Sequence, residues 1–415
     1  MKIVIIGGGI IGCSSALFLQ ESGHQVTILD SAEAMPNCSH GNAGYVCPSH
    51  FTPLATPGIV QQGLRWMLNR ESPFYIQPRL NRDLIRWGWH FIRSANEKKV
   101  MEAAIPLRDI ALFSQSLYEH WAASPEFNFG YEKKGLLEIF QTKTVAEHAA
   151  HTCEKALELG LSGTRLLAYH ELQEFEPDLK FNALGAIWFP GDAHLSPQLL
   201  MTHLNKRLSQ SGVEFIQEKA IGFSVSGKQL KSVITAKQSI SADAVVLAAG
   251  SWSGELTRQL NLSIPLVAGR GYSFTLSNDI FKLRHPAILT EGRVALTPLL
   301  GGKLRIGGTM EIVPTNVPPH FNRMKGVLKA VREFVQDKNI PFPEEKDIWY
   351  GYRPCSADGL PYIGRPKQWN NLVVATGHAM IGLSLGAGTG KLVADLVDDQ
   401  PPAINLEPFH PDRFN

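Results

Sequence analysis

The sequence predicts a mixed α/β fold (α+β overall), in which a Rossmann-like domain with a parallel sheet is joined to a second domain with a mostly antiparallel sheet and covering helices. Three observations predict it. Residues 2–12 join an apolar run to closely spaced glycines, residues 372–390 repeat this pattern, and residues 264–310 contain alternating segments. The first two patterns are typical of junctions between a buried parallel strand and a helix, and the third is typical of antiparallel strands.

The N-terminal segment carries the most specific pattern of the chain. The apolar strand at 2–6 leads into the spacing Gly7-x-Gly9-x-x-Gly12, and a helix over 11–21 and a strand over 25–29 follow. In such a unit Gly7 makes the tight turn, Gly9 lets the backbone approach a pyrophosphate, and Gly12 lets the helix pack closely on the strand. Asp30 ends the second strand, where an acid can accept hydrogen bonds from both ribose hydroxyls and would repel a 2′-phosphate. We therefore expect a dinucleotide other than NADP.

Composition excludes several classes of protein. The 415 residues are enough for two domains, and 44% hydrophobic with 19% charged residues is ordinary for a globular protein. A net charge of +2 and a pI near 8.2 are too mild to indicate nucleic-acid binding. The five cysteines form no CxxC pair, so reduced thiols are expected rather than a disulfide framework or a metal site. The first strand begins at Lys2, which leaves no room for a signal peptide, so we expect a cytoplasmic location.

Two regions after the first unit have distinct compositions. The segment 31–48 contains the small residues of 39–44, which favour contact between backbone amides and a ligand over a plain surface loop. The segment 51–121 contains four tryptophans among apolar residues and arginines, in stretches that resemble amphipathic helices. We expect helices of the second domain that cover the cofactor, and the alternative is a helix at a membrane surface. The arginines that favour this alternative are Arg65, Arg70, Arg79, Arg82, Arg86 and Arg93.

The middle of the chain returns to the pattern of the first thirty residues. Strands are predicted at 135–140 and 185–189 and helices at 144–159 and 196–209, and further strands follow at 213–217 and 242–250. This return predicts that the dinucleotide domain is discontinuous and consists of residues 1–50, 190–260 and 351–415. The second domain would then consist of residues 51–189 and 261–350.

The last third combines an antiparallel region with a second strand–glycine–helix junction. Alternating strands are predicted at 271–276, 293–299 and 303–307, with Gly301-Gly302 as a hairpin turn, and a helix is predicted at 325–335. The segment 335–343 reads as a polar connection, and 349–354 is an aromatic strand with one arginine. The apolar strand 372–375 leads into a helix that we expect to begin just after Met380 and to reach about Val397. Its N-terminal end would carry a partial positive charge.

Several segments together resemble the D-amino-acid oxidase superfamily of flavoproteins (the glycine and sarcosine oxidase group), most closely the bacterial D-amino-acid dehydrogenases. They are IVIIGGGIIG at the start, HGNAGYVCP at 40–48, AGSWSG at 249–254, GRGYSFTL at 269–276, LRIGGTMEI at 304–312, GYRPCSADGLPYIG at 351–364 and TGHAMIGLSLGAGTG at 376–390. They span nearly the whole chain in the order typical of the family. The resemblance implies FAD rather than NAD. It also implies that the FAD is non-covalent, because Gly351 matches the position at which sarcosine oxidases attach the flavin to a cysteine.

The resemblance assigns three groups of cofactor contacts. The N-terminal glycines and Asp30 would hold the adenosine diphosphate half, residues 40–44 would lie along the pyrophosphate and the isoalloxazine, and residues 377–385 would surround the pyrimidine end of the ring. The full set of expected contacts is Gly7, Gly9, Ile10, Ile11, Gly12, Asp30, Ser31, His40, Gly41, Asn42, Ala43, Gly44, Gly250, Trp252, Gly377, His378, Met380, Ile381, Gly382, Leu383 and Ser384.

The resemblance also assigns the substrate site. Arg353 matches the arginine that binds the substrate carboxylate, with a structural ion pair as the alternative role, and Tyr272 and Tyr352 are further pocket candidates. The implied reaction is hydride transfer from the Cα of a small amino acid to the flavin, with a D-amino acid as the favoured substrate. It gives an imino acid that hydrolyses to a 2-oxo acid and ammonia. The segment PGDAHLSP at 190–197 departs from broad-range D-amino-acid dehydrogenases. It brings His194 into the candidate pocket, and with it a cyclic imino acid such as a hydroxy-D-proline as an alternative substrate, beside glycine or sarcosine.

Partners and alternatives follow from the same resemblance. A small amino or imino acid is the expected substrate, with a quinone or another carrier as electron acceptor, or oxygen if the protein is an oxidase. No nucleic acid is expected, and peripheral contact with the inner face of the cytoplasmic membrane stays open. A flavin-binding subunit without turnover is the alternative from another class.

Overall fold

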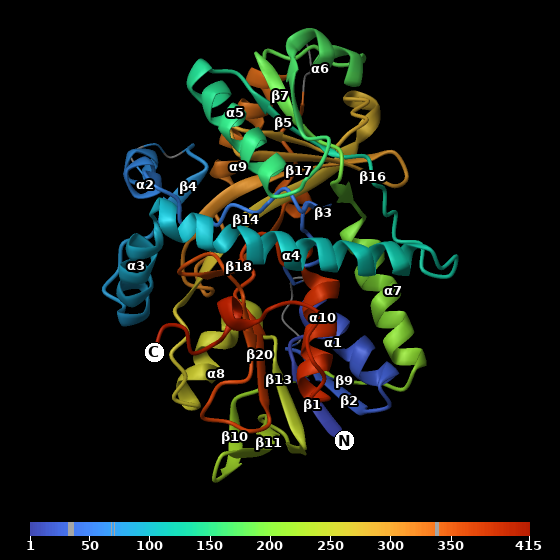
Figure 1. Ribbon diagram of the computed structural model, residues 1–415, viewed down its shortest axis with the longest axis vertical. Coiled ribbons are helices and arrows are strands. Elements are labelled where there is room, and N and C mark those ends of the chain that lie inside the picture. Colours follow the sequence, from blue (N-terminus) through green and yellow to red (C-terminus); the bar gives the residue numbers. More distant parts are fainter. Residues whose placement is uncertain (32–36, 68, 70, 337–339) are drawn as a thin grey trace.

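The computed structural model describes residues 1–31, 37–67, 69, 71–336 and 340–415. The chain forms two stacked halves, each built on one large sheet (Figure 1). Both termini lie in the lower half, which therefore combines the first and the last segments of the sequence. The mixture of one parallel and one mostly antiparallel sheet confirms the predicted fold class.

The lower sheet has the strand order β19-β20-β13-β1-β2-β9 and is parallel except for β19 at one edge. Its strands are β1 (Lys2–Ile6), β2 (Gln25–Leu29), β9 (Glu214–Ile216), β13 (Ala244–Leu247), β19 (Tyr362–Gly364) and β20 (Leu372–Thr376). Alternate residues of β1 enter two different cores: Ile3 and Ile5 face one cluster, and Val4 and Ile6 face the other. Because both faces are covered, β1 is an uninterrupted apolar run.

Helices and a small sheet cover the two faces of the lower sheet. One face carries α1 (Ile10–Glu21), α7 (Pro197–Gln210) and α10 (Gly386–Val397). The other carries α8 (Ser253–Gln259) and the antiparallel strands β10 (Gly222–Ser226), β11 (Gln229–Ile234) and β12 (Ser239–Ser241). The carboxyl ends of β1, β2 and β13 point toward the upper half (Figure 1). This is the edge at which such sheets bind their ligands.

The upper sheet is mostly antiparallel and has the order β18-β14-β17-β16-β15-β5-β7-β6, with β4 paired to β17. Its strands are β4 (Phe74–Ile76), β5 (Leu136–Phe140), β6 (Arg165–Ala168), β7 (Gly185–Phe189), β14 (Leu266–Ser277), β15 (Ala287–Leu289), β16 (Val294–Leu299), β17 (Lys303–Ile312) and β18 (Trp349–Ser356). The predicted hairpin turn is confirmed, since Gly301 and Gly302 join β16 to β17 with φ of +82° and +68°. The helix α9 (Asn322–Phe334) covers one face, while the other looks toward the lower half.

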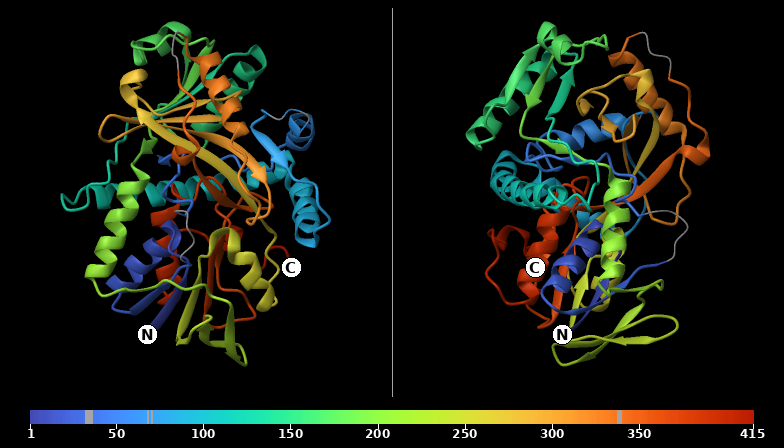
Figure 2. Two further views of the ribbon diagram at one scale, coloured as in Figure 1. Left: turned by 180° about the vertical axis from the view of Figure 1, so that it is seen from behind. Right: turned by 90° about the vertical axis from the view of Figure 1, so that its right-hand side faces the viewer.

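Several helices lie outside these layers. The helix α4 (Glu97–Ala122) crosses the molecule between the two halves and packs on α10 (Figure 1). The helices α2 (Ile59–Met67) and α3 (Arg82–Ser94) stand out at one side, as the view from behind also shows (Figure 2). The helices α5 (Lys143–Glu158) and α6 (Tyr169–Phe175) lie at the top, and the strands β3 (Tyr45–Val46) and β8 (Ala193–His194) form a short antiparallel pair.

The start of the last helix differs from the prediction. We expected the helix to begin just after Met380, but residues 382–385 form a turn and α10 begins at Gly386. The amide of Leu385 donates to the carbonyl of Ile381, and the hydroxyl of Tyr118 in α4 donates to the carbonyl of Leu383 at 2.6 Å. The turn is therefore held in part by a distant helix, which no local pattern announces.

Candidate active site

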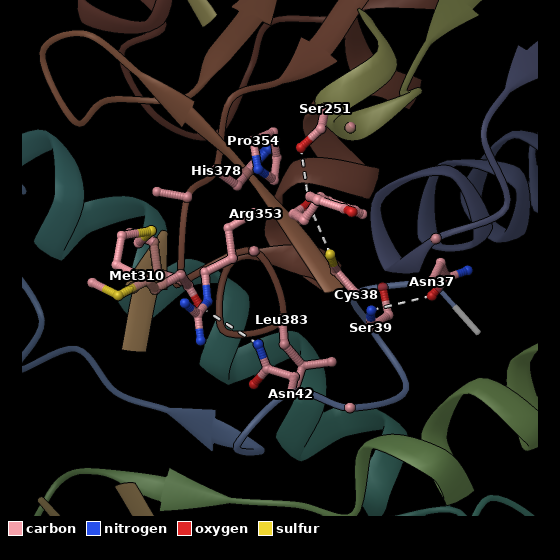
Figure 3. Close-up of a pocket in the computed structure, with 18 of the residues that line it drawn as sticks. Asn37, Cys38, Ser39, Asn42, Ser251, Met310, Arg353, Pro354, His378 and Leu383 are labelled. Atoms are coloured by element: carbon pink, nitrogen blue, oxygen red, sulfur yellow. Dashed lines mark hydrogen bonds between the residues drawn. The ribbon is translucent and has the colours of Figure 1, made fainter. Parts of the chain in front are cut away.

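A cavity of about 940 Å³ lies between the two halves. Its walls come from the β1–α1 junction, the loop 37–43, the residues after β13, the face of the upper sheet and residues 378–384. A volume of this order is typical of a site for a cofactor or a small ligand. Most of the predicted site residues meet here, although they come from both ends of the chain (Figure 3).

The three fingerprint glycines have different neighbours. A Cβ on Gly7, whose φ is +114°, would lie 2.3 Å from the carbonyl oxygen of Ala248, and a Cβ on Gly12 would lie 1.9 Å from the carbonyl oxygen of Gly7. These two glycines are therefore required by the fold itself. A Cβ on Gly9 would meet only the hydroxyl of Ser39, at 3.3 Å, and Gly9 lines the cavity. Its open side faces the space that a pyrophosphate would occupy at the N-terminus of α1.

The residues around this helix start can hold a nucleotide. Asp30 lines the cavity at the end of β2, and its carboxylate accepts a hydrogen bond of 2.9 Å from the amide of Gly8. The hydroxyl of Ser39 accepts one of 2.9 Å from the amide of Ile10, the first residue of α1. Ile10, Ile11 and Ser31 also line the cavity. The arrangement leaves an acid beside the glycines, where a ribose can donate to it.

The loop 37–44 is held against the upper sheet by polar side chains. The hydroxyl of Ser273 donates to the carbonyl of Gly41 at 2.9 Å, and the guanidinium of Arg305 donates to the carbonyls of His40 and Asn42, both at 2.9 Å. Burial lowers the pKa of Arg305 to about 10, so it stays charged at neutral pH. We did not predict Arg305. The sequence did contain a signal for it, because Arg305 is a charged residue at an inward-facing position of a strand with alternating apolar residues.

The C-terminal side of the cavity is the segment after β20. His378, Met380, Ile381, Gly382, Leu383 and Ser384 line it, and Gly250 and Trp252 face it from the segment after β13. The imidazole of His378 is buried against the hydroxyl of Thr389, at 3.1 Å, and burial lowers its pKa to about 3. His378 is therefore neutral, and its contribution to the wall is shape rather than charge.

Arg353 in β18 presents a guanidinium to the cavity beside Met310 (Figure 3). Its Nη1 donates to the carbonyl of Thr309 at 2.5 Å, and no carboxylate among the described residues forms an ion pair with it. In the part of the chain that the structure describes, Arg353 therefore has no carboxylate with which to form a structural ion pair, the alternative role considered for it. Burial lowers the pKa of Arg353. A guanidinium nevertheless remains a cation at neutral pH.

Three other arginines are paired with carboxylates, whereas the buried Arg305 is bonded to backbone carbonyls and to the hydroxyl of Thr275. The guanidinium groups of Arg270 and Arg323 both donate to the carboxylate of Glu311, at 2.8 and 2.6 Å. Arg413 donates two hydrogen bonds to Asp358, at 2.7 and 2.9 Å. A buried cation without such a partner is costly unless a ligand supplies the charge. The guanidinium of Arg353, which is half-buried at the cavity wall, can therefore bind an anionic ligand there.

The backbone around Arg353 is shaped for it. A Cβ on Gly271, in the neighbouring strand β14, would lie 2.1 Å from its Nη2, so the guanidinium rests on a residue without a side chain. Thr309 has φ of +67° and Ala379 has φ of +46°, values that are unfavourable for residues with a Cβ. Thr309 accepts from Arg353, and the amide of Ala379 donates to the carbonyl of Pro354 at 2.8 Å. Such strained residues cluster at functional sites.

Tyr272 and Tyr352 both line the cavity, and the hydroxyl of each already forms hydrogen bonds within the protein. The hydroxyl of Tyr272 donates to Glu311 at 2.7 Å and accepts from the amide of His320, and that of Tyr352 donates to the carbonyl of Val317 at 3.3 Å. Burial and the charge of Glu311 raise the pKa of Tyr272. Both rings therefore act as wall rather than as acids or bases.

Four of the predicted site residues do not line this cavity. Gly12, Gly44 and Gly377 lie behind it; a Cβ on Gly44 would be 2.3 Å from the carbonyl oxygen of Leu195, and one on Gly377 would be 2.7 Å from the ring of Tyr362. His194 was expected in the pocket and is not there. It sits in β8, which pairs with Tyr45, and its ring lines a separate hollow with Glu132, 3.8 Å from the carboxylate. Burial lowers its pKa to about 4.

The sequence analysis did not predict several other residues that line the cavity or pack beside it. The ring of Trp349 occupies the space above Gly41 and Gly351, where Cβ atoms would lie 1.9 and 2.3 Å from it. The thiol of Cys38 donates to the carbonyl of Tyr352 at 2.8 Å, and the hydroxyl of Ser251 donates to the same oxygen (Figure 3). Glu138 of β5 also lines the cavity, and burial together with the nearby Asp192 raises its pKa to about 7. Only the lack of side chains at Gly41 and Gly351 was visible as a sequence signal.

Comparison with known proteins assigns the chain to one family. The family model DAO, described as FAD dependent oxidoreductase, matches residues 2–396. A D-amino acid dehydrogenase of Helicobacter pylori is 29% identical over 402 residues, which cover 96% of this chain and 95% of that protein.

Solved structures agree on the fold. Glycine oxidase from Geobacillus kaustophilus superposes with a TM-score of 0.79 at 22% identity and covers 100% of this chain and 99% of its own. L-proline dehydrogenase from P. horikoshii superposes with a TM-score of 0.71 at 19% identity, covering 100% and 97%.

Proposed function

Because the chain belongs to the DAO family of FAD dependent oxidoreductases, we propose that it oxidises the Cα–N bond of amino acids, with D-amino acids as its substrates. The observation that carries this proposal is the guanidinium of Arg353 at the cavity wall, which forms no ion pair with a carboxylate in the described parts of the chain. A planar cation of this kind binds a carboxylate through two parallel hydrogen bonds. The D-amino acid dehydrogenase of H. pylori, 29% identical, supports the choice of substrate.

FAD is the cofactor of this family, and when bound it supplies the acceptor for the hydride that leaves Cα. The cavity residues fit it: Gly9 is open on the cavity side, Asp30 stands where a ribose would be held, and Arg305 holds the loop 40–42 in place. We infer non-covalent binding, since Gly351 offers no side chain. FAD released by acid precipitation of the protein would support this.

The chain's own residues perform the positioning. Arg353 fixes the carboxylate, and the carbonyl of Thr309 fixes one edge of the guanidinium so that the other edge faces the ligand. A reacting carbon must be held about 3–3.5 Å from its acceptor, and two parallel hydrogen bonds restrict its rotation. The imino acid that results hydrolyses to a 2-oxo acid and ammonia.

Cyclic imino acids are the second substrate class considered from the sequence. The reason was His194 in the segment 190–197, and this side chain faces the separate hollow instead of the cavity. Hydroxy-D-proline therefore has no specific observation in its favour. It belongs in the substrate panel with glycine and sarcosine.

The first prediction is that D-amino acids bleach the flavin of the purified protein under anaerobic conditions. The absorbance near 450 nm is followed with a panel of D- and L-amino acids, hydroxyprolines, glycine and sarcosine. Readmission of air then separates an oxidase, which forms peroxide, from a dehydrogenase that passes electrons to a quinone or another carrier. A protein that holds FAD but is bleached by no member of the panel would contradict the proposal and favour a flavin-binding subunit without turnover.

We further propose that α3 contacts the inner face of the cytoplasmic membrane, where a quinone acceptor would be found. Its outer face exposes Ile85, Trp89 and Ile92 by 60%, 53% and 60%, and the guanidinium of Arg93 lies 4.5 Å from the centroid of the Trp89 ring. Apolar and aromatic residues beside cations favour an anionic lipid surface. Of the arginines considered for this surface, Arg70 lies outside the described residues. Across the described parts of the chain, the helices are too short or too polar to pass through a bilayer.

The second prediction tests this contact. The protein should sediment with vesicles that contain phosphatidylglycerol, and Trp89→Glu should lower the bound fraction by about tenfold, because a charge replaces an interfacial aromatic ring. Leu166→Glu, at a site 41% exposed on β6 in the upper half, is the matched control and should bind as the parent does. Equal binding of both variants would rule out α3 as the contact.

A further inference from the structure

An apolar compartment adjoins Arg353 within the cavity. We define it by five side chains that line the cavity from three elements: Phe74 and Ile76 of β4, Trp87 and Phe91 of α3, and Met310 of β17. Met310 is the register partner of Phe74, and the rings of Trp87 and Phe91 stack with centroids 4.7 Å apart. The three elements thus form one continuous wall.

The compartment is tied directly to the residues around Arg353. The Thr309 carbonyl that accepts from Arg353 immediately precedes Met310, whose Sδ lies 4.0 Å from the Sγ of Cys355. The indole N–H of Trp87 donates to the carbonyl of Cys355 at 3.0 Å. Cys355 stands two residues after Arg353 on the same strand. Met310 lies next to Arg353 (Figure 3). A ligand whose carboxylate is held by Arg353 would therefore have this wall as its neighbour.

The chemistry of the wall is uniform. The cavity-lining residues that the structure describes on β4, α3 and β17 include no charged side chain. The polar atom of Trp87 is already bonded to the backbone, so the indole presents apolar surface only. The residues of β17 that line the cavity also include Thr309, whose buried hydroxyl has no partner among the described residues. A charged group placed against the five apolar side chains would lose its hydration without gaining a counter-charge from them, whereas an apolar group would gain from burial.

We propose that the substrate is an amino acid with a bulky apolar side chain, which enters the apolar compartment while Arg353 holds the carboxylate. This inference rests on the proposed function and narrows its substrate class. The proposal predicts that leucine, methionine and phenylalanine are better substrates than alanine, lysine and glutamate. A difference of one methylene in such a pocket changes kcat/KM by roughly tenfold or more.

The test uses the purified holoenzyme in anaerobic flavin reduction with both enantiomers of phenylalanine, leucine, alanine, lysine and glutamate. For the preferred enantiomer, the second-order rate of bleaching should be about 100-fold higher with phenylalanine or leucine than with alanine, and lower still with lysine or glutamate. Phe91→Ala should reduce the ratio of phenylalanine to alanine by about tenfold, and Phe91→Leu should reduce it less. The matched control is Phe113→Ala, a half-buried ring on α4 that does not line the cavity, which should leave the ratio unchanged.

The outcomes separate this inference from the function on which it rests. Bleaching by no amino acid would defeat the proposed function. Rapid bleaching by alanine or lysine and slow bleaching by phenylalanine would leave that function intact and overturn only the substrate class. If Phe91→Ala changed the KM for a quinone acceptor and not the ratio between amino acids, the compartment would belong to the acceptor, and the inference would fail. Phe91→Leu decides the matter should the alanine variant not fold.

Discussion

Gly9→Val is expected to yield a folded protein without FAD. Gly9 has φ of −77° and ψ of −177°, an extended conformation that any residue adopts, and a Cβ there meets only the hydroxyl of Ser39 at 3.3 Å. The new side chain therefore points into the cavity, where the pyrophosphate must approach the backbone. We expect the ratio of flavin to protein absorbance to fall by roughly tenfold or more, with loss of all activity. The far-ultraviolet circular dichroism should stay that of the apoprotein.

The controls for this variant come from other glycines. Gly191→Val places the same side chain where a Cβ has no neighbour within 4 Å, and this protein should remain yellow. Gly12→Ala should instead impair folding, because its Cβ would lie 1.9 Å from the carbonyl oxygen of Gly7. A Gly9→Val protein that purified with a full complement of FAD would show that the pyrophosphate lies elsewhere.

The contrast among these glycines shows what the sequence could predict. The β1–α1–β2 unit is local, and its spacing alone assigned a turn to Gly7, an open side to Gly9 and a close contact to Gly12. The turn at Gly7 and the close contact of Gly12 arise within this unit, although a Cβ on Gly7 would also meet Ala248, far away in the sequence. The start of α10 was wrong because the turn at 382–385 is held by Tyr118, a residue of α4 that is far away in the sequence.

The same limit explains the errors at the site. His194 lies on a two-residue strand, and which way its ring points depends on the pairing with Tyr45. Arg305 acquires its role only when β17 is placed beside the loop 40–42, and Thr309 only when the side chain of Arg353 on β18 reaches across β14 to β17. Side-chain type was visible in the sequence, but the strand face and the cross-strand partner were not.

Arg353→Lys is expected to raise the KM for the amino acid on the order of 100-fold while the flavin spectrum stays that of the parent. Two charge-assisted hydrogen bonds to a carboxylate in a water-poor cavity contribute about 3 kcal/mol. A lysine ammonium lacks the fork that makes both bonds, and it would compete for the carbonyl of Thr309, which now holds only one edge of the guanidinium. A carboxylate inhibitor without an amino group should lose affinity by the same factor, because it depends on the same pair of bonds.

The matched control is Arg413→Lys. Arg413 is also half-buried, but it is bonded to both oxygens of Asp358 and stacks 3.9 Å from the ring centroid of Tyr362. Its replacement should lower the melting temperature and leave the KM within about twofold, since it removes a structural pair. For Arg353→Lys the expected order is reversed: a large change in KM and a small change in stability, because no carboxylate of the described protein loses its partner. If Arg353→Lys lowered the melting temperature and left the KM unchanged, Arg353 would be a structural residue, and the substrate carboxylate would have to bind elsewhere.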